Sequence, residues 1–217
     1  MPPLRIDVWS DLACPWCYIG KRRLDAALAQ AALPAGVDIT WRAFELDPSA
    51  PAVRDDGLTQ AERLAAKYRR SAAEAEAMIA NVTRIAAGDG LGFRIDLSKS
   101  GNTFDAHRVI KLAATHGRAT EAKERLFRAH FTDGRALGDR ATLVELATEL
   151  GLDAAEVEAT LAGDRFAAEV RADQRLAREL GISGVPFFVF DQRLAVSGAQ
   201  PVAALVGAIA QAVAADA

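Results

Sequence analysis

Hydrophobic and polar positions divide the chain into a short β-rich start, a long helical middle and a second β-rich part near the end. A strand pattern over residues 4–9 is followed by helical spacing from Cys14 to about Ala32, and alternation returns over residues 37–42. A right-handed crossover makes the two strands of such a strand–helix–strand unit parallel. We therefore expect the chain to open with a parallel βαβ unit.

The middle of the chain has only helical patterns. Two capping boxes begin at Thr59 and Ser71, and Asp139, Asp153 and Asp164 are predicted N-caps of later helices. Apolar stripes over residues 78–86 and 104–113 end at glycines, which commonly terminate helices. No strand is predicted in this block.

Strand character returns over residues 186–190 and, after a turn, over residues 194–197, before a last amphipathic helix. A βαβ start and a ββα end form the α/β thioredoxin architecture, a mixed four-stranded sheet. We predict a discontinuous thioredoxin-like domain from residues 1–50 and 180–217. Residues 51–179 form the predicted inserted helical domain, whose last helix, about 165–180, packs back on the sheet.

Composition narrows the classes of function. The 217 residues are 51% hydrophobic and 25% charged, as in ordinary globular domains. The net charge is −3 and the basic residues are interleaved with acidic ones, which argues against a nucleic-acid partner. The sequence contains no run of about 18 apolar residues to cross a membrane and no signal peptide at its start, so we expect a cytoplasmic protein.

The chain has two cysteines, Cys14 and Cys17, separated by Pro15 and Trp16 at the start of the first predicted helix. This spacing allows a small disulfide ring. Unpaired amides and the dipole of a helix start stabilise a thiolate, so we expect a lowered pKa for Cys14 and a nucleophilic role for it. Cys17, one turn later, is expected to resolve the mixed disulfide that Cys14 forms.

Two other interpretations of this cysteine pair are weaker. A zinc site needs about four ligands, and the three histidines, His107, His116 and His130, are not spaced as a ligand pair. Inert thiols do not explain a proline early in the helix directly after a strand. We therefore expect no bound metal and no bound organic cofactor.

A second candidate feature is Gly184-Val185-Pro186 at the start of the third strand. A proline in a sheet is confined to an edge or to the first residue of a strand, which alone is an adequate explanation. Cis bonds are only about 5–6% of X-Pro bonds in folded proteins. In combination with the cysteine motif, however, a cis Val185–Pro186 bond beside Cys14 becomes the favoured interpretation.

Four segments together resemble the DsbA family of thioredoxin-fold oxidoreductases: residues 14–23 (CPWCYIGKRR), 102–108 (NTFDAHR), 184–189 (GVPFFV) and 197–201 (SGAQP). They are most similar to its cytosolic FrnE-like branch, related to 2-hydroxychromene-2-carboxylate isomerase and kappa-class glutathione transferase. The resemblance covers about residues 4–213. It implies that Cys14 and Cys17 are the redox pair and that Pro186 is a cis-proline, with Val185 presenting a backbone edge to substrate.

The sequence differs from these relatives in ways that bear on function. The glutathione-dependent members carry serine where Cys14 stands, so two thiols here favour dithiol–disulfide exchange. Some FrnE-like proteins have a further cysteine pair, which this chain lacks. Exported members have signal peptides, so reduction or isomerisation in the cytosol fits better than oxidation of secreted chains.

Several polar residues have open roles. Asn102 or Thr103 most simply caps a helix, and His107 is either packed or a proton carrier near the thiols. The segment from Ser197 and Gly198 to Gln200 is either a turn and cap or a nest of amides for a carboxylate such as that of glutathione. Asp7 and Asp11 flank the motif and could shift the pKa of Cys14, but the sequence does not tell which of them points inward.

The leading hypothesis is therefore a thiol–disulfide oxidoreductase or isomerase acting on disulfide-bearing proteins or small molecules. The candidate substrate-contacting residues are Pro15, Trp16, Val185, Pro186, His107, Ser197 and Gly198. Glutathione as co-substrate and a homodimer remain open. The alternative is a glutathione-dependent isomerase or transferase acting on an aromatic or polyketide-like compound, and a third interpretation is a protein that holds clients without turnover.

Overall fold

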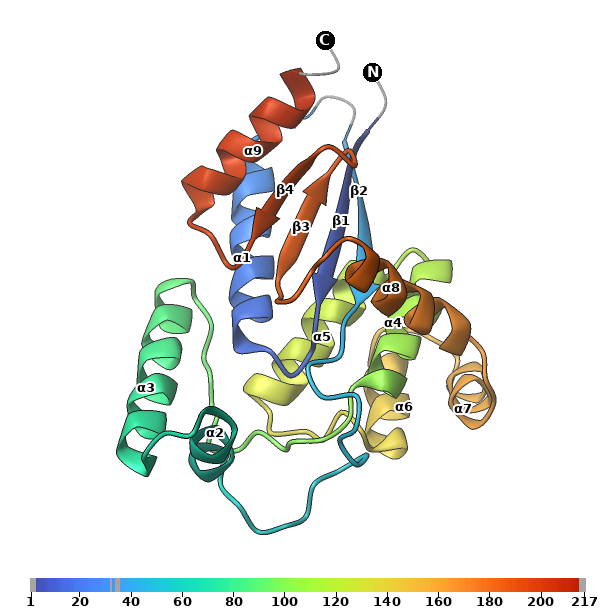
Figure 1. Ribbon diagram of the computed structural model, residues 1–217. Helices are drawn as coiled ribbons and strands as arrows, with labels where there is room; N and C mark the ends of the chain where they lie inside the picture. Colours follow the sequence, from blue (N-terminus) through green and yellow to red (C-terminus); the bar gives the residue numbers. More distant parts are fainter. Residues whose placement is uncertain (1–2, 32, 34–35, 215–217) are drawn as a thin grey trace. The chain divides into compact units, whose positions relative to one another are not determined.

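The computed structural model describes residues 3–31, 33 and 36–214, and these form two compact units (Figure 1). The sheet unit is built from Met1–Leu46 and Phe166–Ala217, and the helical unit from Asp47–Arg165. The helical unit is thus one continuous insertion in the sheet unit. The last helix of the predicted insertion, α8 (Ala167–Glu179), belongs to the sheet unit.

The sheet has four strands in the order β2-β1-β3-β4. Its strands are β1 (Leu4–Ser10), β2 (Val37–Ala43), β3 (Phe187–Phe190) and β4 (Leu194–Ser197). β1 runs parallel to β2 and antiparallel to β3, and β4 is antiparallel to β3. The fold is therefore the predicted thioredoxin-like α/β fold, with a helical insertion between its two halves.

Helices cover both faces of this sheet. α1 (Pro15–Gln30) and α9 (Val202–Ala214) pack against each other on one face, and α8 lies on the other face (Figure 1). Alternate residues of a strand point to opposite faces. Trp9 of β1 accordingly packs on the α8 face with Ala177 and Ile182 in an apolar cluster.

A charged cluster joins α8 to the sheet. The guanidinium of Arg42 contacts Asp7 at 2.7 Å and Asp173 at 3.0 Å, and Asp173 also accepts a hydrogen bond from the backbone N–H of Ala43. These two carboxylates raise the pKa of Arg42, although burial acts in the opposite direction and is the largest single influence. The cluster keeps buried charges paired, as interiors require.

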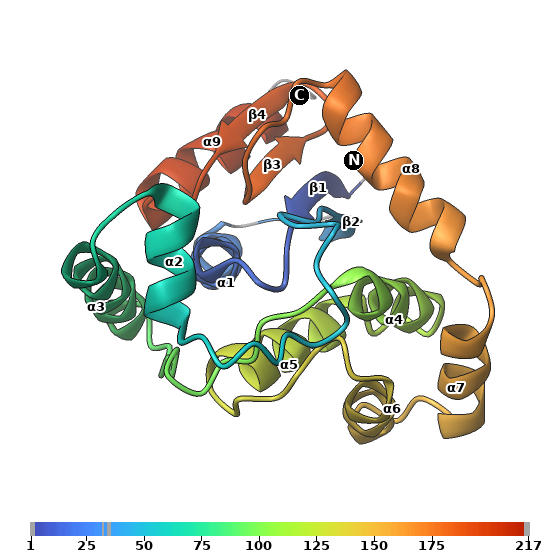
Figure 2. The ribbon, with the colours of Figure 1, turned by 60° about the horizontal axis from the view of Figure 1, so that its bottom comes forward.

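The helical unit contains six helices among its described residues (Figure 2). They are α2 (Gln60–Tyr68), α3 (Ala72–Gly88), α4 (Phe104–Thr115), α5 (Ala119–Phe131), α6 (Arg140–Glu149) and α7 (Ala154–Ala162). α2 packs against α3, and α4 packs against α5, α6 and α7. Both predicted capping boxes are confirmed, since Thr59 and Ser71 exchange hydrogen bonds with Glu62 and Glu74.

Arg108 of α4 is a buried hydrogen-bonding centre of the helical unit. Its guanidinium donates to the backbone carbonyls of Thr160, Gly163 and Arg165. It also pairs with Asp105 at 2.8 Å, and its side chain is 3% exposed. One arginine thereby satisfies the carbonyls at the end of α7 and in the segment that follows it.

Three sequence expectations about the helices were wrong or incomplete. Asp164 does not cap α8, whose N-cap is Phe166 in a left-handed conformation. α5 was not singled out, since Arg118 at its N-cap offers no capping hydrogen bond. Met78 is 41% exposed, because the smaller Ala75 and Ala86 form the buried face of α3 with Val82.

Two further expectations concern chain ends and membranes. α1 ends at Gln30, and the predicted end near Ala32 falls outside the described residues.

Within residues 3–31, 33 and 36–214, no helix combines the length and apolar character needed to span a bilayer.

Candidate active site

The two cysteines lie at the start of α1. Cys14 is the N-cap residue, in an extended conformation, and Pro15 occupies the first turn. Its side chain makes no capping hydrogen bond, and its carbonyl accepts from the backbone N–H of Cys17 at 3.0 Å. The sulfur is therefore not engaged in capping the helix, and the second sulfur follows one turn later.

Exposure differs along this motif. Cys14 is 5% exposed, Cys17 is 1% exposed and Trp16 between them is 38% exposed. Both cysteines are free thiols. The more accessible thiol is thus the one expected to attack, and an exposed aromatic side chain stands next to it.

The Val185–Pro186 peptide bond is cis, as the motif and the resemblance led us to expect. The Cys14 Sγ atom lies 3.7 Å from the carbonyl oxygen of Val185, to which the thiol donates. Residues separated by 171 positions in the chain are thereby brought together at the thiol.

Gly20 is a site residue that the sequence analysis did not single out. A methyl group at Gly20 would lie 2.7 Å from Cγ of Pro186 and 3.2 Å from Cζ of Phe188. Since Gly20 stands three residues after Cys17, it lies on the same face of α1 as that cysteine. The absence of a side chain at this position lets α1 approach the start of β3. A glycine inside a helical pattern is a signal that could have identified it.

We predict that Gly20→Ala lowers the free energy of unfolding by about 1–3 kcal/mol, because the added methyl displaces Pro186 or α1. Disulfide exchange should also slow, since the same displacement moves Val185 relative to Cys14. Denaturant unfolding and exchange kinetics provide the measurements.

Gly207→Ala in α9 is the matched control. A methyl group there meets no atom within 4 Å, so this variant should gain up to about 1 kcal/mol of stability from helix propensity alone. Equal stability changes in the two variants would contradict the proposed packing of Gly20 on Pro186.

The turn after β4 is held against Pro186 and α1. The backbone N–H of Gly198 donates to the carbonyl of Pro186 at 2.8 Å, and that of Gln200 donates to the carbonyl of Gly198 at 2.9 Å. Arg23 of α1 donates to the carbonyl of Ala199 at 2.6 Å. In the candidate nest, which begins at Ser197, the amides of Gly198 and Gln200 thus already donate hydrogen bonds within the fold.

The polar segment before α4 divides into residues with different tasks. Thr103 is the N-cap residue of α4 but its side chain makes no capping hydrogen bond, and Asn102 accepts from the backbone N–H of Phe104 at 2.8 Å. Asn102 therefore supplies the capping interaction. His107 is 2% exposed within the helical unit, and its part in the chemistry stays a prediction.

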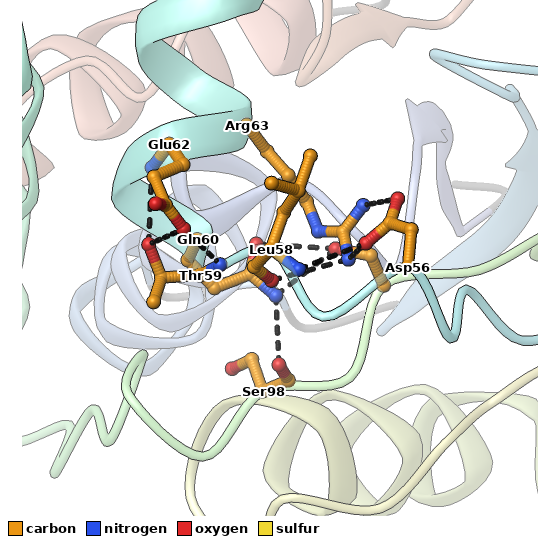
Figure 3. Close-up of polar contacts among 8 residues, drawn as sticks. Asp56, Leu58, Thr59, Gln60, Glu62, Arg63 and Ser98 are labelled. Atoms are coloured by element: carbon orange, nitrogen blue, oxygen red, sulfur yellow. Dashed lines mark hydrogen bonds and ion pairs between the residues drawn. The ribbon is translucent and has the colours of Figure 1, made fainter.

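A cavity in the helical unit is a separate feature. It measures about 910 Å³ and is lined by segments 53–63 and 95–100 together with Glu76 and Ile79. Figure 3 shows its polar contacts: Gln60 donates to the carbonyl of Ser98, and Arg63 pairs with Asp56. Hydrogen bonds from Arg63 lower the pKa of Asp56 to about 2. Its lining residues do not include either cysteine.

Comparisons with known proteins agree with this geometry. A family model described as a DSBA-like thioredoxin domain matches residues 5–210. The crystal structure of probable DsbA oxidoreductase SCO1869 from Streptomyces coelicolor is 44% identical. The match covers 97% of this chain and 90% of that one, with a TM-score of 0.91.

Two more distant structures show the same fold. Cytosolic disulfide reductase DsbM from Pseudomonas aeruginosa, solved with GSH, is 22% identical with a TM-score of 0.67, over 95% of this chain and 98% of that one. 2-Hydroxychromene-2-carboxylate isomerase is 16% identical with a TM-score of 0.72, over 98% of this chain and 97% of that one.

The family match extends over nearly all of the chain and includes the Cys14–Cys17 pair at the start of α1. A relative of 44% identity carries the oxidoreductase description over almost the same length. The chain therefore belongs to the DSBA-like thioredoxin domain family and is a disulfide oxidoreductase of the DsbA type.

Proposed function

We propose that this oxidoreductase works in the cytoplasm as a reductase or isomerase of disulfides in proteins or small molecules, with glutathione as co-substrate. The observation that supports this most strongly is the position of Cys14, a capping residue whose sulfur lies beside the Val185 carbonyl, with Cys17 one turn away. The P. aeruginosa protein is described as a disulfide reductase and was solved with GSH. Both facts support disulfide reduction as the direction of the proposed reaction and glutathione as its co-substrate.

The proposed cycle uses each cysteine once. The Cys14 thiolate attacks one sulfur of a substrate disulfide, forms a mixed disulfide and displaces the other substrate sulfur as a thiolate. Cys17 then gives up its proton and attacks the Cys14 sulfur, which releases the second substrate thiol. The Cys14–Cys17 disulfide left behind is reduced by two glutathione thiols, which leave as oxidised glutathione.

Substrate contacts would come from the surface around Cys14. The backbone of Val185 offers an edge for an extended chain, and Trp16 adjoins Cys14 as an exposed apolar surface. Pro15 and Pro186 shape this edge, and the turn at Ser197 and Gly198 supports it through Pro186. These are proposed roles for backbone and apolar groups rather than for charged ones.

The test is disulfide exchange by the purified protein with oxidised glutathione and with a peptide that contains a disulfide. We expect the reduced wild type to reduce both substrates stoichiometrically, and to reduce the peptide catalytically when excess reduced glutathione is added. Cys14→Ser should reduce neither. An active Cys14→Ser protein would overturn the assignment of Cys14 as the attacking thiol.

The likeness to 2-hydroxychromene-2-carboxylate isomerase supports a second candidate, a glutathione-dependent isomerase or transferase acting on an aromatic or polyketide-like compound. Such a reaction needs no resolving thiol. Turnover of an aromatic substrate that survives Cys17→Ser would favour it over dithiol exchange.

A further inference from the structure

The pairing of β3 with β4 ends in a single hydrogen bond at Pro186. Phe187 lies opposite Ser197, and the N–H of Gly198 extends the pairing by one residue, to the carbonyl of Pro186 at 2.8 Å. In a hydrogen-bonded antiparallel pair, the two opposed residues exchange two such bonds. Proline has no N–H, so Pro186 cannot donate the second bond. The strand pairing alone therefore holds the turn after β4 to Pro186 by one hydrogen bond.

Arg23 of α1 supplies a second attachment for this turn. Its Nη1 atom donates to the carbonyl of Ala199 at 2.6 Å, across 176 positions of the chain. The carbonyl of Gly198, one residue earlier, accepts from the N–H of Gln200 at 2.9 Å and is thus bound within the turn itself. The arginine therefore fastens to α1 the residue directly after the one that bonds Pro186.

Three contacts then connect α1 with the segment of Val185 and Pro186. The Cys14 thiol donates to the carbonyl of Val185 at 3.7 Å. The Pro186 ring lies close to Gly20, where an added methyl group would be 2.7 Å from its Cγ atom. The hydrogen bond from Arg23 to the turn is the third contact, and Arg23 lies on the same face of the helix as Gly20, three residues before it. The helix that carries the attacking sulfur thus also holds the backbone edge at Val185.

We propose that Arg23 is a positioning residue that fixes the Val185 edge relative to the Cys14 sulfur and thereby favours disulfides in extended polypeptide chains. This inference rests on the proposed function, because it concerns the same thiol and the same substrate edge. The step affected is the attack of the Cys14 thiolate on a substrate sulfur, which forms the mixed disulfide and releases the other substrate sulfur as a thiolate. A disulfide without a peptide backbone cannot lie along the edge, so its reaction gains nothing from the position of Val185.

The experiment measures single-turnover rate constants of the reduced protein with two substrates. One is a peptide that contains a disulfide, and the other is bis(2-hydroxyethyl) disulfide, which has no peptide bond. Arg23→Met keeps the apolar stem and removes the donor. Its rate constant with the peptide should fall about tenfold, because misplaced groups react more slowly, whereas that with the small disulfide should change less than about twofold. Arg23→Lys keeps a charged donor, so its rate constant with the peptide should lie between those of Arg23→Met and the wild type.

Arg193→Met is the matched control. It removes the same charge at the opposite end of β4, where the Arg193 side chain is 46% exposed and lies 3.7 Å from Asp191. This variant should leave both rate constants unchanged. The pH of half-maximal alkylation of Cys14 is a further readout, and it should be the same in Arg23→Met and the wild type. A shift of this midpoint with equal slowing of both substrates would overturn the inference and assign Arg23 to the electrostatics of the thiol.

The remaining outcomes are also decisive. An Arg23→Met protein that reduces the peptide as fast as the wild type would contradict the positioning role. If this variant does not fold, the ratio of the two rate constants in Arg23→Lys answers the same question, and a ratio equal to that of the wild type would overturn the inference. A wild type that reduces neither substrate would instead refute the proposed function itself.

Discussion

A Cys17→Ser protein is expected to accumulate mixed disulfides between Cys14 and its substrates. Cys17 is placed one turn after Cys14, so its attack on the mixed disulfide is intramolecular. Serine cannot perform this attack, so an external thiol must release the substrate instead. An external thiol is much less effective than Cys17, which is held beside the mixed disulfide at a high effective concentration. We expect turnover with protein disulfides to fall more than about a hundredfold, although the first attack by Cys14 is retained.

Non-reducing gels of cells that express the variant, followed by mass spectrometry of the adducts, are the measurement. The control is the Cys14→Ser/Cys17→Ser double variant, which should show no adducts. If Cys17→Ser yields no more adducts than the wild type, proteins are not the substrates, and adducts with glutathione or another small thiol should then be sought on the intact protein.

The second large effect is expected from Arg108→Ala in the helical unit. Removal of the guanidinium leaves the carbonyls of Thr160, Gly163 and Arg165 without this donor in a buried setting. The loss of a buried charged partner of this kind costs about 3–5 kcal/mol. Asp105 keeps its second partner, Arg140, at 3.0 Å, so the destabilisation comes mainly from the carbonyls that lose their donor.

Denaturant unfolding compares this variant with Arg128→Ala. The Arg128 side chain is 66% exposed and lies 3.8 Å from Asp133, so its loss should change stability by less than about 0.5 kcal/mol. The loss of stability in Arg108→Lys should lie between those of the other two variants, because one ammonium group cannot donate to as many separate carbonyls as a guanidinium. An Arg108→Ala protein within 1 kcal/mol of the wild type would show that water replaces the guanidinium at little cost.

The sheet and most helix starts could be predicted because their signals are local. A short β-rich segment marked β1, and alternation marked β2. The side chains of four predicted N-caps accept the expected hydrogen bonds: Thr59, Ser71, Asp139 and Asp153. In each case the residues that decide the structure lie within one turn of each other, so the pattern is visible in the sequence.

The start of α8 could not be predicted in the same way. Asp164 is a suitable capping residue, yet the helix begins after Phe166. Its N-cap residue, Phe166, adopts the left-handed conformation and makes no side-chain capping hydrogen bond. This conformation is unusual for a phenylalanine, so the residue type gives no signal of it in the sequence.

The candidate site likewise contains residues that the sequence pattern identified and residues that only the structure identified. The cysteine motif identified the thiols, and their resemblance to a known family suggested Pro186. Gly20 became significant only when α1 and β3 were seen in contact, since its role is defined by the Pro186 ring 2.7 Å from an added methyl. Asp7 and Asp11 were both candidate charges; Asp7 contacts Arg42, and Asp11 accepts hydrogen bonds from the amides of Ala13 and Leu46.

The division of the sheet unit into Met1–Leu46 and Phe166–Ala217 has a consequence for synthesis on the ribosome. Translation proceeds at roughly 5–20 residues per second, so the nascent dithiol emerges many seconds before β3, which pairs with β1. The helical unit is translated in full during this interval, whereas the sheet unit still lacks its second segment. The contact between Cys14 and the Val185 carbonyl therefore forms only when the last quarter of the chain has been translated, and the site is complete only then.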